Sequence, residues 1–565
     1  MKILGIHDGH NAAVCLLEDG KIVIAEQEER YTYEKNQGGM PVNTIKQILN
    51  NDPLDSIDKI AFVGSYMGQY DWSREEILAS YARSGTVKDI FRQSIKQSKI
   101  AFALYKKSAS QPRLKSIKQL FGEKKVEFID HHLCHASAAY YGKGAYDTPI
   151  LVVTADGEGD GRSGSVYIGK DGKLNELLTL PSRDSMGRLY SFITYLFNMV
   201  PYEHEYKIMG LAPYCTDRKR IDQCKNRLSG ILGFQDSHAL LWKYKGKYPN
   251  IQSAGREIKN IFDSTRFDVM AGAIQEFTED LITEWIRRIV KYTGVNDIAL
   301  SGGLFMNVKM NMLLARLPEI NSIYVYPSCG DESNAIGAAY YVQARDNSEL
   351  PQALKSYYLG EDLQFEETWL KNAIPNNVSV EHHEDIEAQI AKLLAKGEIV
   401  GRVKGPMEFG ARSLGNRAIL ANPSVDGVLR TINEMIKGRD FWMPFAPSVL
   451  EEDLGRYFKQ DNTVVDYEYM IFTADSNKNV RTYAKNALHP YDYTGRPQAV
   501  RKEDNPDYYN LLKCYKEITG ESLILNTSYN LHGFPMVKGG EQALHVFKNS
   551  DLKYLGLGNY MLRKE

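Results

Sequence analysis

Alternating apolar and polar positions predict a β-hairpin near the start of the chain. Residues 7–30, HDGHNAAVCLLEDGKIVIAEQEER, contain two apolar runs separated by Asp19-Gly20, a pair that favours the positive φ of a tight turn. A second segment repeats this plan. A strand over 150–155 leads to Asp156-Gly157 and another strand, and Asp171-Gly172 turns the chain into a return strand. The repeat predicts a duplicated α/β domain.

A glycine-rich turn adds a third element to this plan. Residues 297–311, DIALSGGLFMNVKMN, predict a buried strand that ends at Ser301-Gly302-Gly303 and leads into a helix. Glycines at such a position let backbone N–H groups approach a nucleotide closely. Together with the two hairpins, this layout is similar to the actin, sugar-kinase and Hsp70 ATPase fold, in which a nucleotide lies between two halves.

A long helix and a change of pattern indicate the domain organisation. Apolar residues spaced by three and four positions predict a buried amphipathic helix over 269–290, with a role in core packing. Polar residues and a proline replace this pattern at 345–358, and a new strand follows in 398–405, EIVGRVKG. We therefore expect two domains, 1–350 and 351–565, as a chain of 565 residues allows.

Composition excludes some classes of partner. Charged residues make up 25% of the chain and the net charge is -2, so no nucleic-acid partner is expected. The N-terminus turns polar after six residues and no apolar run reaches the ~18 residues of a membrane span, which predicts a cytoplasmic protein. One segment, 83–125, is rich in lysine and arginine. It is either a solvated face or a docking surface for an anionic acceptor.

Residues 129–142, IDHHLCHASAAYYG, suggest a metal site. On a helix, His131 and His135 share a face, whereas His132 points about a quarter-turn away. Asp156 and Asp331 stand at the ends of apolar strands, and two histidines with two carboxylates suit Fe(II), Mn(II) or Zn(II). From these residues alone, a hydrogen-bonded histidine cluster remains the alternative.

A set of motifs in a fixed order extends over nearly the whole chain. The motifs are HDGHNAAV, EQEERYTYEK, HHLCHASAAYY, YKIMGLAPY, SGGLFMNVKMN, PSCGDESNAIGAA, EFGARSLGNRAIL, KGRDFWMPFAPS, RPQAV and LNTSYNLHGFPMV. This order strongly resembles the NodU/CmcH-type O-carbamoyltransferases. The resemblance implies a Kae1-like N-terminal domain fused to a YrdC/Sua5-like α/β domain. It also implies an enzyme that makes carbamoyl adenylate from carbamoyl phosphate and ATP, and passes the carbamoyl group to a hydroxyl of a sugar or natural product.

The same resemblance implies roles for individual residues. The implied iron ligands are His131, His135, Asp156 and Asp331, with Mn or Zn as alternative metals, and the implied catalytic residues are His10 and Lys35. The residues implied to contact the nucleotide or carbamoyl adenylate in the N-terminal domain are Lys207, Gly210, Gly302, Gly303, Asn307 and Asn311. Those implied to bind carbamoyl phosphate and Mg-ATP in the C-terminal domain are Lys404, Arg412, Arg417, Lys437, Arg439, Arg496, Asn526, Ser528 and Asn530.

Some positions depart from the family pattern, which reads QGRMEFGPRALG and often RPFAPS. The departures are Lys404, Pro406, Ala411 and Met443, so one or two guanidinium contacts are missing, and Lys404 is expected to replace part of that charge. Arg412 and Arg417 lie five positions apart around Gly415 and are expected to reach one site.

Three alternative functions fit the sequence less well. A tRNA threonylcarbamoylation enzyme is disfavoured by the near-neutral charge, and a hydrogenase-maturation carbamoylation enzyme by the lack of acylphosphatase and zinc modules. An Hsp70-like ATPase switch has no use for the C-terminal arginines. The acceptor, the loaded metal and the oligomeric state, with a homodimer as one option, are left open.

Overall fold

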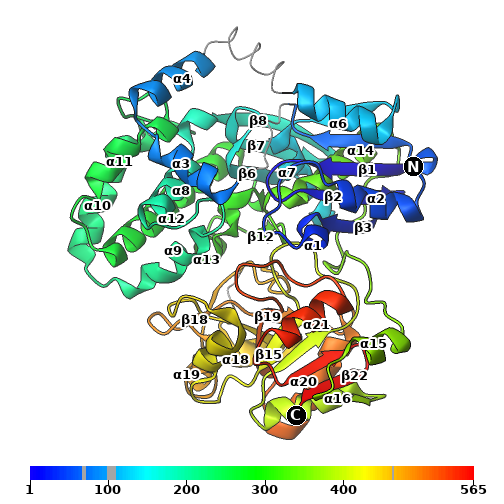
Figure 1. The fold of residues 1–565 in the computed structure, drawn as a ribbon. Helices are drawn as coiled ribbons and strands as arrows, with labels where there is room; N and C mark the ends of the chain where they lie inside the picture. The colour runs from blue at the N-terminus through cyan, green and yellow to red at the C-terminus, as the bar shows by residue number, and fades with distance from the viewer. Residues whose placement is uncertain (66–71, 98–109, 461–462) are drawn as a thin grey trace. The chain divides into compact units, whose positions relative to one another are not determined.

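A computed structural model describes residues 1–65, 72–97, 110–460 and 463–565 (Figure 1). The chain forms two compact units. The N-terminal unit comprises 1–23, 36–354 and 463–465, and the C-terminal unit comprises 24–35, 355–462 and 466–565. The segment 24–35, which contains the EQEER motif, thus belongs to the C-terminal unit although it lies near the start of the chain.

Two five-stranded sheets of matching topology are built from residues of the N-terminal unit, except for the last four residues of β3. In the first, the order is β3(Lys21–Gln27), β2(Ala13–Glu18), β1(Lys2–His7), β4(Lys59–Val63) and β5(Val126–Ile129). In the second, the order is β8(Lys173–Pro181), β7(Arg162–Lys170), β6(Ile150–Gly159), β11(Asp297–Ser301) and β12(Ser322–Val325). Each sheet joins a hairpin strand to two parallel strands. This duplication confirms the expected fold class.

The structure confirms the predicted tight turns at Asp19-Gly20 and Asp171-Gly172, but it differs from the prediction after residue 155. Asp19-Gly20 and Asp171-Gly172 all have positive φ, as a tight turn requires. The strand expected to end at 155 instead continues through Asp156 to Gly159, with an irregular register, and the turn falls at Asp160-Gly161. Asp156 therefore lies within a distorted strand rather than in a turn.

Two helices pack closely against each other and against the sheets. α7(His131–Lys143) contacts β6 and β11, whereas α14(Asn334–Asp346) contacts β1, β2 and β4. A Cβ atom on Gly337 of α14 would lie 1.9 Å from the carbonyl oxygen of Cys134 in α7. Only glycine permits this close approach, which brings the two helix starts together.

The remaining helices of the N-terminal unit cover these layers. They are α2(Val42–Asn51), α3(Arg74–Ala82), α4(Val87–Gln97), α6(Gln111–Phe121), α8(Met186–Leu196), α9(Glu205–Leu211), α10(Arg218–Ile231), α11(Gly255–Ile261), α12(Phe267–Thr293) and α13(Val308–Ala315), with a small hairpin of β9(Leu232–Phe234) and β10(Trp242–Tyr244). The predicted helix over 269–290 is confirmed as α12. No helix among the described residues is both long and apolar enough to cross a membrane.

The basic segment 83–125 is described only in part. Lys99, Lys106 and Lys107 lie outside the described residues. Within the described part, Arg113 is buried and forms a bidentate ion pair with Asp8, while Lys115 and Lys118 are exposed. Arg113 therefore belongs to the core rather than to a solvated basic face.

The C-terminal unit is built on a mixed eight-stranded sheet. Its order is β13(Val378–His382), β22(Tyr560–Lys564), β21(Tyr554–Leu557), β14(Val400–Val403), β15(Arg417–Ala421), β20(Leu523–Ser528), β16(Ala446–Leu450) and β19(Gln498–Val500). The helices are α1(Glu29–Thr32), α15(Glu367–Ala373), α16(Ile386–Ala395), α17(Val428–Ile432), α18(Leu454–Tyr457), α19(Lys478–Tyr483), α20(Pro506–Thr519) and α21(Gly540–Lys548), with short strands β17(Ala474–Asp475) and β18(Thr494–Gly495).

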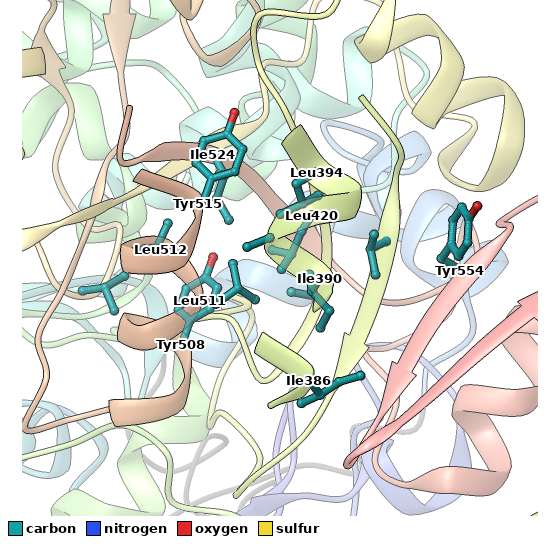
Figure 2. Close-up of a cluster of buried hydrophobic side chains, with 14 of the residues drawn as sticks. Ile386, Ile390, Leu394, Leu420, Tyr508, Leu511, Leu512, Tyr515, Ile524 and Tyr554 are labelled. Carbon is teal, nitrogen blue, oxygen red and sulfur yellow. The ribbon is translucent and has the colours of Figure 1, made fainter. Parts of the chain in front are cut away.

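A buried apolar cluster joins this sheet to α16 and α20. Figure 2 shows Ile386, Ile390 and Leu394 of α16 close to Leu511 and Leu512 of α20. The i, i+4, i+8 spacing in α16 places its three residues on one face, so that the face is buried against the sheet.

Candidate metal centre and cation cluster

Four side chains of the N-terminal unit converge on one point. One ligand atom from each of His131, His135, Asp156 and Asp331 lies within 4.8 Å of all the others. His131 Nε2 is 3.3 Å from Asp156 Oδ2, and His135 Nε2 is 3.4 Å from Asp331 Oδ1. Nitrogen and oxygen donors so arranged could hold a divalent transition metal ion. The structure thus brings together the four residues that the sequence suggested as metal ligands.

Local structure explains how each ligand reaches this point. Asp130 caps α7 by accepting the N–H of Leu133 at 3.0 Å, so the helix begins at His131 and presents His131 and His135 on one face. Asp156 projects from the irregular part of β6. Its Oδ1 accepts the N–H of Gly303 at 3.1 Å.

Neighbouring hydroxyls orient the imidazoles. His135 Nδ1 lies 3.3 Å from Ser301 Oγ, which leaves Nε2 to face the cluster. His132 instead turns away and pairs through Nδ1 with Thr154 Oγ1 at 2.9 Å. This arrangement agrees with the quarter-turn offset predicted for His132.

Burial and mutual charge shift the pKa values within the cluster. Burial, and then the nearby Asp156 carboxylate, raise the pKa of Asp331 to about 7. Burial favours the neutral imidazole of His131, but the Asp331 and Asp156 carboxylates outweigh it and raise its pKa to about 9. Two half-buried carboxylates this close repel each other, which a bound cation would relieve.

His10 lies beside this cluster. The Nε2–H of the buried His7 donates to the backbone carbonyl of His10 at 2.9 Å, and His7 Nε2 is 3.8 Å from Asp331 Oδ2. The His10 ring lies 5.8 Å from the ring of Tyr202. His7 thus links the hairpin that carries His10 to the aspartate of the cluster. The sequence did not single out His7 or Tyr202.

The glycine-rich loop has the conformation that its glycines suggested. Gly302 has φ +106, and a Cβ there would lie 2.3 Å from the carbonyl oxygen of Ala155. Asn307 caps α13 and exchanges hydrogen bonds with Gln275 at 2.9 Å, while Asn311 donates to the carbonyl of Phe305 at 2.7 Å. Both asparagine side chains therefore hold the loop itself. Lys207 and Gly210 lie on α9, which packs on α12.

Five cations gather in the C-terminal unit, and we call them the cation cluster: Lys35, Arg412, Lys437, Arg439 and Arg496. Burial lowers the pKa of Lys437 well below its usual value, and the charges of Arg439 and Lys35 lower it further. Burial likewise lowers the pKa of Arg496, with added repulsion from Arg412 and Arg439. Like charges that destabilise one another in this way are typical of a site for polyanions.

Lys437 connects the cation cluster to the predicted polar loop. Its Nζ donates to Asn530 Oδ1 at 2.6 Å and to the carbonyl of Ser528 at 2.5 Å. Lys437 ends a π-helical turn, Asn433–Lys437, and His532 Nδ1 lies 2.9 Å from its carbonyl oxygen. The structure thus brings Lys437, Ser528 and Asn530 together.

Three other residues predicted to bind phosphate, Arg417, Lys404 and Asn526, instead form hydrogen bonds or ion pairs with other protein groups around the loop that carries Arg412. Arg417 is fully buried, and its guanidinium donates to the backbone carbonyls of Lys538, Gly405 and Asn416. Lys404 forms ion pairs at 2.9 Å with both Glu387 and Asp507. Asn526 donates to Ser413 O, Ser448 Oγ and Gln498 Oε1. These contacts engage the polar groups of all three residues with other protein groups. That Arg412 and Arg417 both reach one phosphate site stays a prediction.

Glu408 organises the same loop, although sequence reasoning gave it no role. The buried Oε1 of Glu408 accepts the backbone N–H groups of Leu414, Asn416 and Arg417 at 2.8 to 3.1 Å. A carboxylate with three backbone donors fixes the loop conformation. Its position within the MEFG motif was the signal that could have indicated this role.

Comparison with known proteins identifies the family. The family model for the carbamoyltransferase N-terminus matches residues 2–340, and that for the carbamoyltransferase C-terminus matches residues 391–564. The chain belongs to the carbamoyltransferase family. Both units of this carbamoyltransferase are thus covered, and it is a transferase enzyme.

Relatives of this carbamoyltransferase match over most of their length. The nodulation protein NolNO of Sinorhizobium fredii is 29% identical over 98% of this chain and 79% of its own. A 3'-hydroxymethylcephem-O-carbamoyltransferase of Amycolatopsis lactamdurans is 25% identical over 94% of each chain. Among solved structures, full-length HypF is 13% identical with a TM-score of 0.34, over 62% of this chain and 47% of its own. That likeness is too low to carry an argument.

Proposed function

We propose that the protein is an O-carbamoyltransferase that uses ATP and carbamoyl phosphate and has a separate site for each half-reaction. The observation that carries this proposal is the cation cluster, in which burial and, after it, neighbouring like charges lower the pKa values of Lys437 and Arg496. Such an arrangement is costly unless anions balance it, and both substrates are polyanions.

The first half-reaction is assigned to the cation cluster. Water hydrolyses carbamoyl phosphate to carbamate and phosphate, and a carbamate oxygen then attacks the α-phosphorus of ATP. The bond from that phosphorus to pyrophosphate breaks, which yields carbamoyl adenylate and pyrophosphate. Arg412, Arg439 and Arg496 bind phosphate oxygens through their guanidinium forks, and Lys35 and Lys437 add positive charge.

The second half-reaction is assigned to the N-terminal unit. The donors fit a divalent metal because two half-buried carboxylates and two buried imidazole nitrogens face one point. We propose Fe(II), with Mn(II) or Zn(II) as alternatives. When bound, such an ion polarises carbonyl or phosphoryl oxygens of the intermediate. Gly302 and Gly303 would let the loop backbone approach carbamoyl adenylate.

His10 is the proposed general base. The hydroxyl oxygen of the acceptor attacks the carbamoyl carbon, its proton passes to the imidazole, and the bond from that carbon to the adenylate oxygen breaks, which releases AMP. General-base help of this kind contributes ~10²–10⁴ in rate. The hydrogen bond from His7 to the His10 carbonyl supports this role, since it fixes the backbone that carries the base.

The acceptor is proposed to be a hydroxyl of a sugar, oligosaccharide or natural product. This proposal rests on the relatives, one of which is named for carbamoyl transfer to a hydroxymethylcephem. The test is incubation with Mg-ATP, carbamoyl phosphate and Fe(II) against aminoglycosides, nucleosides, lipo-oligosaccharides and polyketides, followed by mass spectrometry. A carbamoylated product that requires carbamoyl phosphate is expected from wild type and from a control variant of the exposed Arg430, Arg430→Ala, but not from Arg496→Ala. Equal yields from all three would contradict the proposal.

A further inference from the structure

Asn334 contacts a nitrogen atom that the proposed metal site requires. It is the first residue of α14 and is fully buried, and its Nδ2 lies 3.1 Å from His135 Nε2. Its Oδ1 is buried and has no hydrogen-bond partner among the described residues. A buried acceptor without a partner is unfavourable, so this amide is in an unfavourable state without a ligand.

Packing holds Asn334 in this place. Gly337 follows one turn later, and its close approach to the carbonyl of Cys134 fixes the start of α14 against α7. Asp331 precedes Asn334 by three residues, at the start of the short turn Asp331–Ser333 that leads directly into α14. The amide therefore cannot move far from His135 and Asp331 without separating the two helices.

A metal ion would compete with the present hydrogen bond. Because His135 Nδ1 is engaged by Ser301 Oγ, Nε2 carries the lone pair that accepts a hydrogen bond from Asn334 or binds a metal. Once Nε2 binds a cation, an N–H group of Asn334 directed at the same point is repelled. A rotation of the Asn334 amide by half a turn replaces this N–H group with Oδ1. In the present orientation Oδ1 has no hydrogen-bond partner among the described residues, so a cation on His135 Nε2 favours the half-turn.

We propose that Asn334 is a fifth protein ligand of the metal, through Oδ1. Ligand atoms held about 2.1 Å from one ion lie about 3.0–3.4 Å apart, and the 3.1 Å between Asn334 and His135 agrees with this spacing, as does the 3.4 Å between His135 and Asp331. An amide oxygen adds a hard donor and a fifth position, which favours Mn(II) or Fe(II) over four-coordinate Zn(II). The inference rests on the metal site of the proposed function.

The test measures metal binding without substrates. Wild type, Asn334→Ala and Asn334→Asp are dialysed against Mn(II) or Zn(II), and bound metal is determined by elemental analysis and, for Mn(II), by electron paramagnetic resonance. Gln343→Ala is the matched control, because Gln343 is a buried amide nine residues further along the same helix, and it donates to the carbonyl of Glu349 instead of to a residue of the cluster. Thermal unfolding of each variant verifies that it is folded.

Asn334→Ala should bind Mn(II) at least about 10-fold more weakly than wild type, with a smaller loss for Zn(II), whereas Asn334→Asp and Gln343→Ala should keep Mn(II) affinity. Wild-type Mn(II) affinity in Asn334→Ala would overturn the ligand assignment alone. A loss in Asn334→Asp equal to that in Asn334→Ala would also overturn it, since a carboxylate oxygen can ligate. Wild-type protein that binds neither metal would overturn the metal site itself.

Discussion

Arg30 donates a hydrogen bond to the backbone carbonyl of Gly410 at 2.6 Å, across 380 positions of sequence. The same guanidinium donates to the carbonyl of Met536, and Gln27 accepts the N–H of Gly410. Tyr33 stacks on Phe534 with ring centroids 5.0 Å apart. The EQEER segment is therefore an integral part of the C-terminal unit, and it delivers Lys35 to the cation cluster.

This position leads to a prediction for Lys35. Lys35→Met should slow the formation of carbamoyl adenylate by about 10- to 100-fold, because one charge-assisted phosphate contact contributes about 1.5–3 kcal/mol. Transfer from externally supplied carbamoyl adenylate should be unchanged. Both rates are measured in single turnover, with the exposed Lys46→Met as control. A defect confined to carbamoyl transfer would contradict this role and would assign Lys35 to the transfer site instead.

Loss of Arg417 should lower the stability of the protein, whereas loss of Arg412 should lower its affinity for carbamoyl phosphate. Arg417→Ala removes a buried guanidinium and leaves several carbonyls without donors, so it should lower the free energy of unfolding by about 3–5 kcal/mol. Arg412→Ala should keep stability and lose affinity for carbamoyl phosphate. Denaturant unfolding and substrate binding are measured for both variants. Wild-type stability of Arg417→Ala with lost phosphate binding would contradict the structural role.

The contrast between these arginines shows how far the sequence could lead. The hairpins, the glycine loop and the four clustered His and Asp residues follow from local spacing and from the rule that strand ends carry functional side chains. The buried role of Arg417 depends on its contact with Lys538, 121 positions away, and the placement of Lys35 depends on contacts such as Arg30 with Gly410, 380 positions away. No local pattern encodes either. Asn334 was missed because its contact with His135 depends on the close packing of two helices.

His10→Asn tests the proposed base. Asparagine retains hydrogen-bonding capacity and similar size but cannot accept the proton, so transfer should slow by about 10²–10⁴ while carbamoyl adenylate binds normally. The comparison is single-turnover transfer from preformed intermediate against the dissociation constant of that intermediate. Unchanged transfer would remove His10 from the chemistry. Weaker binding with normal transfer at saturation would make it a binding residue.

His135→Ala should impair the second half-reaction and spare the first, the reverse of the effect expected for Lys35→Met. Loss of one ligand should lower metal content and abolish transfer, because the cluster is then one donor short. Formation of carbamoyl adenylate should continue, since it is assigned to the C-terminal unit. His132→Ala is the control, because His132 pairs with Thr154 instead of the cluster. Full transfer activity in metal-free wild type would contradict a metal requirement.

The most direct measurement of the central claim is the release of pyrophosphate and phosphate by the purified protein, given Mg-ATP with and without carbamoyl phosphate and with no acceptor present. The account predicts pyrophosphate only when carbamoyl phosphate is present, with one phosphate released for each pyrophosphate, and loss of both in Arg496→Ala. Hydrolysis of ATP to ADP and phosphate that is independent of carbamoyl phosphate, as an ATPase switch would show, would contradict it.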